Sequence, residues 1–193
     1  MTARPLTRSE ERARQQGLEA ASPDLPVTAR SLTPDEVRAN DGRVMMIVFG
    51  VYLAVTLLLT LLVLVGDGLP VWAAPAALFM AIPVGLFVRA RARRRSDYRD
   101  PGIEVTVGKN AVTVRDAQHS ATIDFAELSG CRISHYSSKT AVIFLGIELE
   151  TPSGPLKLEE GWFKGGTRAA ATIVKQLDAR GLPLAGRPTR SGR

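Results

Sequence analysis

The chain has 193 residues, of which 45% are hydrophobic, and a formal net charge of +6. A single cysteine excludes an intramolecular disulfide, which suits a reducing cytoplasm. The basic excess lies mainly at and after the end of a long uncharged segment, and this position favours contact with anionic lipid over nucleic acid.

The N-terminal residues 1–43 are expected to form a polar, mostly disordered tail. They carry seven arginines against seven acidic side chains and few large apolar residues, so they bury too little surface to stay ordered alone. They are also too polar and too long to be a secretory signal. Thr33-Pro34-Asp35-Glu36 has the form of a capping box with proline at the first helical position, which predicts a short helix before the apolar region.

Two apolar blocks, Val44–Val65 and Val71–Val88, contain no Asp, Glu, Lys, Arg or His. As helices they would reach about 33 and 27 Å, close to the roughly 30 Å of a bilayer core. A buried helical hairpin in a soluble protein is the alternative. Two uncharged runs of this length placed back to back favour a transmembrane hairpin over residues 44–88. Because the runs contain no ionisable side chain, they lack the usual mark of an ion path.

Arginines on one side of the blocks predict the orientation. Arg38 and Arg43 precede the first block, and the turn between the blocks carries only Asp67. This bias places both termini in the cytoplasm, with the protein in the plasma (cell inner) membrane. The juxtamembrane segment 89–100 follows the second block, and its arginines are expected to contact anionic lipid headgroups. These are Arg89, Arg91, Arg93, Arg94 and Arg95.

Residues 101–187 predict one small domain of antiparallel strands. Ile103–Arg115 alternates apolar and polar residues around a turn at 108–110, which is typical of a hairpin. Further alternating segments predict an antiparallel meander, with a bulge or two-sided burial at 141–145. These segments are 121–125, 131–135, 140–150 and 156–159.

The period changes in the last predicted element. Thr167 is expected to cap an amphipathic helix that runs to about Ala179 and is stopped by Gly181. The preceding Gly161–Gly166 lacks the spacing of a phosphate-binding loop and indicates a wide turn between strand and helix. The apolar stripe of the helix is expected to cover the open end of the sheet, and residues 188–193 to form a loose tail. The stripe comprises Ala170, Ile173, Val174 and Leu177.

Candidate catalytic residues do not form a recognisable constellation. Cys131 and His135 lie four apart on a predicted strand, about 13 Å from each other at a rise of about 3.3 Å per residue, which is too far for a thiolate–imidazole pair. We interpret Cys131 as a small buried hydrophobic residue. The spacing of His119 and His135 does not suit a shared metal ion. Glu148 and Glu150 lie on one face of a predicted strand, which indicates a solvated face. We therefore predict no enzyme activity, no cofactor and no metal.

Two spans, an arginine-rich junction and strands that end in an amphipathic helix resemble the small bacterial membrane proteins that carry a pleckstrin-homology-like (bacterial PH) domain. The matching pieces are Ile103–Arg115, Ile123–Ile133 and Thr167–Ala179, in roughly the last half of the chain. The resemblance implies a bent antiparallel barrel of seven strands, capped by a C-terminal helix, that serves binding. In eukaryotic relatives basic residues of the first hairpin loop hold phosphoinositide headgroups, whereas here that loop offers only Lys109.

Three functions remain open at this point. The first is a membrane-anchored adaptor that recruits a protein partner or assembles with itself. The second is a reader of anionic lipid surfaces, and the third is an enzyme whose site the sequence hides. An antiparallel meander that ends without closing leaves an edge for strand addition, which favours the adaptor.

Overall fold

The computed structural model describes residues 5–65, 82, 84–93, 98–128, 130–151, 154–182 and 184. The chain divides into two compact units. Unit 1 contains residues 1–32 and 100–193, and unit 2 contains residues 33–99. Helices together with two antiparallel sheets form unit 1, while unit 2 contains one long apolar helix.

Unit 1 has a five-stranded sheet in the order β4-β3-β2-β1-β8 and a three-stranded sheet in the order β5-β6-β7. The predicted hairpin forms as β2 and β3, with Val105 opposite Val114, and the other expected strands also form. The predicted segment 121–125 shifts by one residue, because Phe125 begins a 3-10 helix instead of ending a strand. The strands are β1 (Val27–Ser31), β2 (Glu104–Val107), β3 (Ala111–Arg115), β4 (Ser120–Asp124), β5 (Gly130–Ser137), β6 (Val142–Thr151), β7 (Gly154–Glu159) and β8 (Phe163–Lys164).

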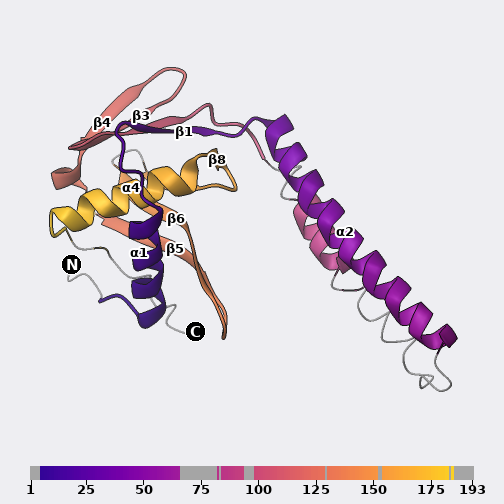
Figure 1. The fold of residues 1–193 in the computed structure, drawn as a ribbon. Helices are drawn as coiled ribbons and strands as arrows, with labels where there is room; N and C mark the ends of the chain where they lie inside the picture. Colours follow the sequence, from indigo (N-terminus) through magenta and orange to yellow (C-terminus); the bar gives the residue numbers. More distant parts are fainter. Residues whose placement is uncertain are drawn as a thin grey trace, which may run out of the picture. The chain divides into compact units, whose positions relative to one another are not determined.

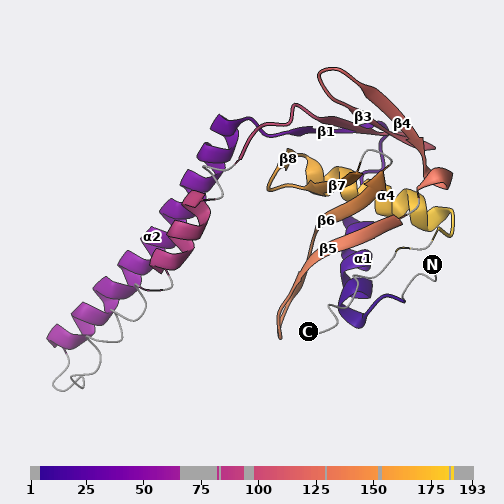
Figure 2. The ribbon, with the colours of Figure 1, turned by 180° about the vertical axis from the view of Figure 1, so that it is seen from behind.

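The N-terminal arm, residues 5–32, is folded, which differs from the expected disordered tail. Thr7 and Glu10 form a reciprocal capping box at the start of α1 (Arg8–Ala20), and β1 pairs with β2 on one side and β8 on the other. Helix α1 contacts α4 and the strands β5 and β6, as Figure 2 shows from behind. The arm gains its order from packing on the rest of unit 1, since most of its buried residues are small, among them Ala13, Gly17 and Ala29.

Helix α4 (Gly166–Ala179) forms the centre of the core and contacts both sheets (Figure 1). Its predicted stripe is buried, with Ile173 and Leu177 at 0% and 2% exposure. The expected cap at Thr167 is wrong: the helix is capped by Gly165 in a left-handed conformation, φ +76°, and the Thr167 hydroxyl donates to the Leu145 carbonyl at 3.3 Å. Glycine adopts this positive φ readily because it has no Cβ, whereas a threonine at the cap position would be strained.

A bulge interrupts the pairing of β5 with β6, at Leu145 opposite the step from Ser134 to His135. The bulge confirms one of the two expectations for 141–145. Beyond it, Phe144 is buried while Ile143 and Leu145 are exposed, because the extra residue shifts which side chains face inward.

Unit 2 contains α2 (Pro34–Val65), which begins with the predicted capping box: the Thr33 amide donates to Glu36 at 3.1 Å and the Glu36 amide to Thr33 at 3.3 Å. The expected short helix and the first apolar block are therefore one continuous helix. Among the described residues, one helix, over Pro34–Leu58, is long and apolar enough to cross a membrane. Residues 84–93 are helical, whereas the predicted turn at 66–70 and most of the second block lie outside the described residues.

The chain leaves unit 1 after β1 and returns to it just before β2, at neighbouring positions. The Ser31 amide donates to the Ile103 carbonyl at 2.8 Å, and the Ile103 amide donates back to the Ser31 hydroxyl at 3.1 Å. The same hydroxyl donates to Asp100 at 2.5 Å, and Asp100 also accepts from the Gly102 amide at 2.9 Å. This junction makes the whole of unit 2 the connection of one β-hairpin.

Candidate functional site

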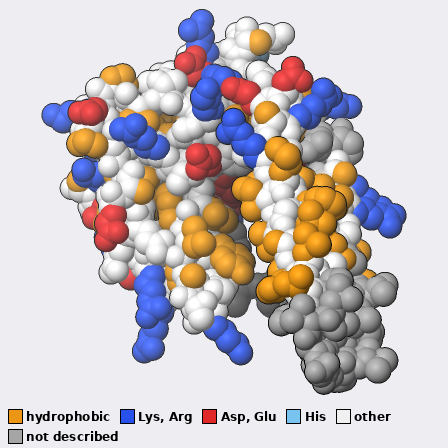
Figure 3. All heavy atoms as spheres, turned by 45° about the vertical axis from the view of Figure 1, so that its right-hand side comes forward, with side chains coloured by type: hydrophobic (Ala, Val, Ile, Leu, Met, Phe, Trp, Pro, Cys, Tyr) orange, Lys and Arg blue, Asp and Glu red, His pale blue; other side chains and the backbone are white. Residues whose placement is uncertain are grey.

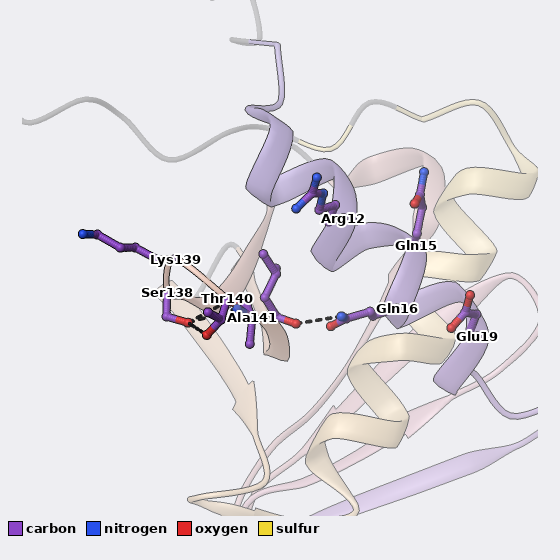
Figure 4. Close-up of a pocket in the computed structure, with 9 residues that line it drawn as sticks. Arg12, Gln15, Gln16, Glu19, Ser138, Lys139, Thr140 and Ala141 are labelled. Atoms are coloured by element: carbon purple, nitrogen blue, oxygen red, sulfur yellow. Dashed lines mark hydrogen bonds between the residues drawn. The ribbon is translucent and has the colours of Figure 1, made fainter.

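A polar groove of about 560 Å³ lies between α1 and the turn that joins β5 to β6 (Figure 4). The turn is held by Ser138, whose amide donates to the Ala141 carbonyl at 2.8 Å and whose hydroxyl accepts from the Ala141 amide at 3.0 Å. The residues that line the groove are Arg12, Gln15, Gln16, Glu19, Ser138, Lys139, Thr140, Ala141 and Val142.

Gln16 positions the two walls of the groove. Its amide nitrogen donates to the Val142 carbonyl at 2.7 Å (Figure 4), and its amide oxygen accepts from the Phe144 amide at 3.1 Å. These groups lie on the edge of β6 that β7 does not reach, because β7 pairs only from Gly146 onward. A side-chain amide thus completes hydrogen bonds that a further strand would make, which fixes α1 to the sheet edge.

The groove is charged but open. Arg12 and Lys139 are exposed on opposite walls, and Glu19 lies on the α1 side. With two cations, one carboxylate and several amide and hydroxyl groups, the lining suits an extended polar segment with acidic side chains. Neither Arg12 nor Gln16 was expected from the sequence. The signal that could have found their helix is Thr7-Arg8-Ser9-Glu10, the capping-box pattern.

The arginines expected at lipid headgroups separate in the structure. Arg89 and Arg93 are exposed on the helical segment 84–93, one turn apart. Arg91 is half-buried, pairs with the buried Asp41 of α2 and lies over the Phe87 ring at 5.7 Å. The positive charge of Arg91 therefore neutralises Asp41 within unit 2, since a buried carboxylate needs a charged partner. Arg94 and Arg95 lie outside the described residues.

Potential nucleophiles and bases are spread over unit 1. Burial raises the pKa of the Cys131 thiol to about 12, which leaves almost no thiolate at neutral pH. His135 lies 3.3 Å from the Ser9 hydroxyl through Nε2, and its Nδ1 is buried. The exposed His119 lies 3.6 Å from Asp116, whose pKa is lowered by the amides of Gln118 and His119. The structure does not bring these groups into one site.

The remaining sequence candidates have structural partners. Glu150 pairs with Arg132 on the neighbouring strand, and Glu148 stands opposite Lys157. The glycine-rich turn contains β8, and a side chain at Gly166 would lie 2.8 Å from the Glu159 carbonyl, so close packing requires that glycine. At the β2–β3 turn, the Lys109 carbonyl accepts a hydrogen bond from Arg180, whose guanidinium also lies 5.0 Å from the Phe125 ring.

Comparison of the chain with models of protein families, with curated proteins and with solved structures finds no match.

Proposed function

We propose that this protein is a membrane-anchored, non-catalytic binding protein whose domain at the cytoplasmic face recruits a protein partner or assembles with itself. The observation that carries this proposal is an apolar helix, exposed along most of its length, placed between two neighbouring strands of one folded unit.

The surface of α2 supports a membrane environment. Eight of its large apolar side chains are between 49% and 75% exposed, and Figure 3 shows hydrophobic side chains gathered along this unit. Soluble monomers seldom expose contiguous apolar surface of this extent, since each such side chain gains about 1.5–3 kcal/mol on leaving water. The exposed side chains of α2 are Met46, Ile47, Phe49, Val51, Leu53, Leu57, Leu58 and Leu61.

The connectivity of unit 1 supports an even number of crossings. β1 precedes α2 and β2 follows unit 2, and the two strands pair antiparallel from Val27–Val107 to Arg30–Glu104. Both ends of unit 2 must therefore lie on one side of a membrane. If α2 crosses, the chain crosses back, and the block Val71–Val88 has the length and composition to do so. The arginine bias favours the cytoplasm as that side.

The strand order supports a PH-like domain, provided that β1 is its first strand. Strands β1–β4 lie in one sheet, β5–β7 in the other, and α4 follows, which agrees with seven strands and a closing helix once the two-residue edge strand β8 is set apart as an addition. On this assignment the first hairpin loop is not the turn at Lys109 but the whole of unit 2. The loop that holds lipid headgroups in eukaryotic relatives would here be the membrane anchor itself.

The groove beside α1 is the proposed partner site, because its two cations suit an acidic segment. Reversing both charges with Arg12→Glu and Lys139→Glu in the full chain should abolish capture of the partner by crosslinking in native membranes. Lys157→Glu, an exposed position on β7, is the matched control and should leave capture unchanged. Equal capture by the groove variant and the control would refute the groove as the site.

An anionic-lipid reader is the second candidate function, favoured by the exposed Arg89 and Arg93 on segment 84–93. It predicts that Arg89→Gln with Arg93→Gln in full-length protein weakens its association with anionic lipid while partner capture persists. An enzyme with an unrecognised site is the third candidate. It predicts that the combined His119→Ala, His135→Ala and Cys131→Ser variant loses its function in cells although it still folds.

A further inference from the structure

The β5–β6 hairpin carries an exposed apolar face on the side opposite α1. Tyr136 and Ile143 are cross-strand partners, and Leu145 follows two residues along β6. Their exposed fractions are 56%, 49% and 39%. Val142 and Phe144, which alternate with them, turn inward, and Phe144 packs beneath Gly17 of α1. The hairpin is thus amphipathic, with one face in the core and one apolar face in solvent.

We propose that this face, which we call the hairpin patch (Tyr136, Ile143 and Leu145), inserts into the headgroup–acyl boundary of the membrane that anchors the protein. The inference rests on the proposed membrane anchor and adds a second, peripheral contact made by unit 1.

The size of the patch favours lipid over a second copy of the chain. Three side chains at these exposures present on the order of 300 Å². A stable protein interface needs about 800 Å² on each partner. A tethered domain needs less, because the anchor already confines it to the membrane and raises the effective concentration of lipid.

The chemistry of the tip also suits a membrane interface. Tyrosine is enriched where one end of a side chain is apolar and the other is wet. Beyond Tyr136 and Ile143 the turn carries Ser137, Ser138, Lys139 and Thr140, which are polar groups without an acidic residue among them.

The base of the β5–β6 hairpin lies near the point at which the chain leaves unit 1. The Leu32 amide donates to the Trp162 carbonyl at 2.9 Å, and the Trp162 amide to the Glu159 carbonyl at 3.1 Å. Glu159 stands opposite Gly146 in the β6–β7 ladder, and the hairpin projects beyond that point.

The test uses the full chain, one molecule per nanodisc of phosphatidylcholine with a minority of phosphatidylglycerol. An environment-sensitive maleimide is placed at Ile143→Cys, and at Gln118→Cys in the exposed β3–β4 turn as the matched control. The native Cys131 is buried and does not compete for the label. A probe at position 143 should shift its emission to shorter wavelength and lose intensity when spin-labelled lipid is added, whereas a probe at 118 should do neither.

A third label, at Leu57→Cys in α2, separates the two proposals. Quenching at 57 without quenching at 143 overturns the hairpin patch and leaves the anchor intact. Absence of quenching at 57 overturns the anchor and this inference with it. A blue shift at 143 that appears only when two chains share a disc, without lipid quenching, assigns the patch to a second copy and also overturns the inference.

Discussion

Truncation of Leu177 on α4 is the sharpest probe of how unit 1 is held together. Its side chain is 2% exposed, in a core to which α4, both sheets and α1 contribute. Leucine to alanine at such a site removes the buried methyl groups and leaves a cavity, at a cost of about 2–5 kcal/mol. That is a large share of the roughly 5–15 kcal/mol by which a domain is stable.

The measurement needs unit 1 as a soluble chain. Because Ser31 bonds both Asp100 and Ile103, a short Gly-Ser linker in place of residues 33–99 should close the β1–β2 hairpin without strain. In urea, with a slope of about 2 kcal/mol per M, a loss of about 3 kcal/mol lowers the unfolding midpoint by about 1.5 M.

Lys175→Ala is the control on the same helix, two residues away and exposed, and should change the stability by less than about 0.5 kcal/mol. Ile173→Val should fall between them, at about 0.5–1.5 kcal/mol. Equal midpoints for Leu177→Ala and Lys175→Ala would show that α4 does not pack as described. A linked chain that does not fold would refute the closure of unit 1 across β1 and β2.

Three further predictions concern single positions. Gly146→Ala should destabilise unit 1 by more than about 3 kcal/mol, because its Cβ would lie 1.9 Å from the Leu158 carbonyl; Gly161→Ala, with open space around it and no positive φ, is the comparison in the same urea titration. Cys131 should resist alkylation at pH 8 in the folded chain and react rapidly in urea, since burial raises its pKa to about 12; equal rates in both conditions would contradict its burial. Asp116 has a pKa held below 3.8 by the Gln118 and His119 amides, so its contribution to the β3–β4 turn is present above pH 3.8 and is lost as pH falls through its lowered value. Amide exchange of Gln118 and His119, normalised for intrinsic rates, should lose protection over that range, and Asp116→Asn should remove the dependence.

The strands and the last helix could be predicted because each carries its own local signal. Val105, Val107 and Val112 alternate with polar residues, and the α4 stripe repeats at helical spacing, so the period alone identifies the inward face. These signals could not show that β4 and β5 belong to different sheets, since the turn through the 3-10 helix at Phe125–Glu127 depends on packing.

The N-terminal arm could not be read from hydropathy. Apart from Glu10 of the capping box, the buried residues of α1 are Ala13 and Gly17, and those of β1 are Ala29 and Ser31, so these two elements are ordered by close approach of small residues rather than by large apolar side chains. Its place beside β2 is also a contact across the 71 residues that separate Ser31 from Ile103, which no local pattern reports. The groove could not be predicted either, because α1 forms one of its walls.

We propose above all that unit 2 is a membrane hairpin inserted between two strands of one cytoplasmic domain. Labelling of intact cells with an impermeant maleimide tests it most directly, using single substitutions Asp24→Cys before the hairpin, Asp67→Cys between the blocks and Gln118→Cys after them. We predict labelling from outside at position 67 alone, with positions 24 and 118 reacting only after the membrane is opened. Outside labelling at just one of positions 24 and 118 would place β1 and β2 on opposite sides and contradict the account.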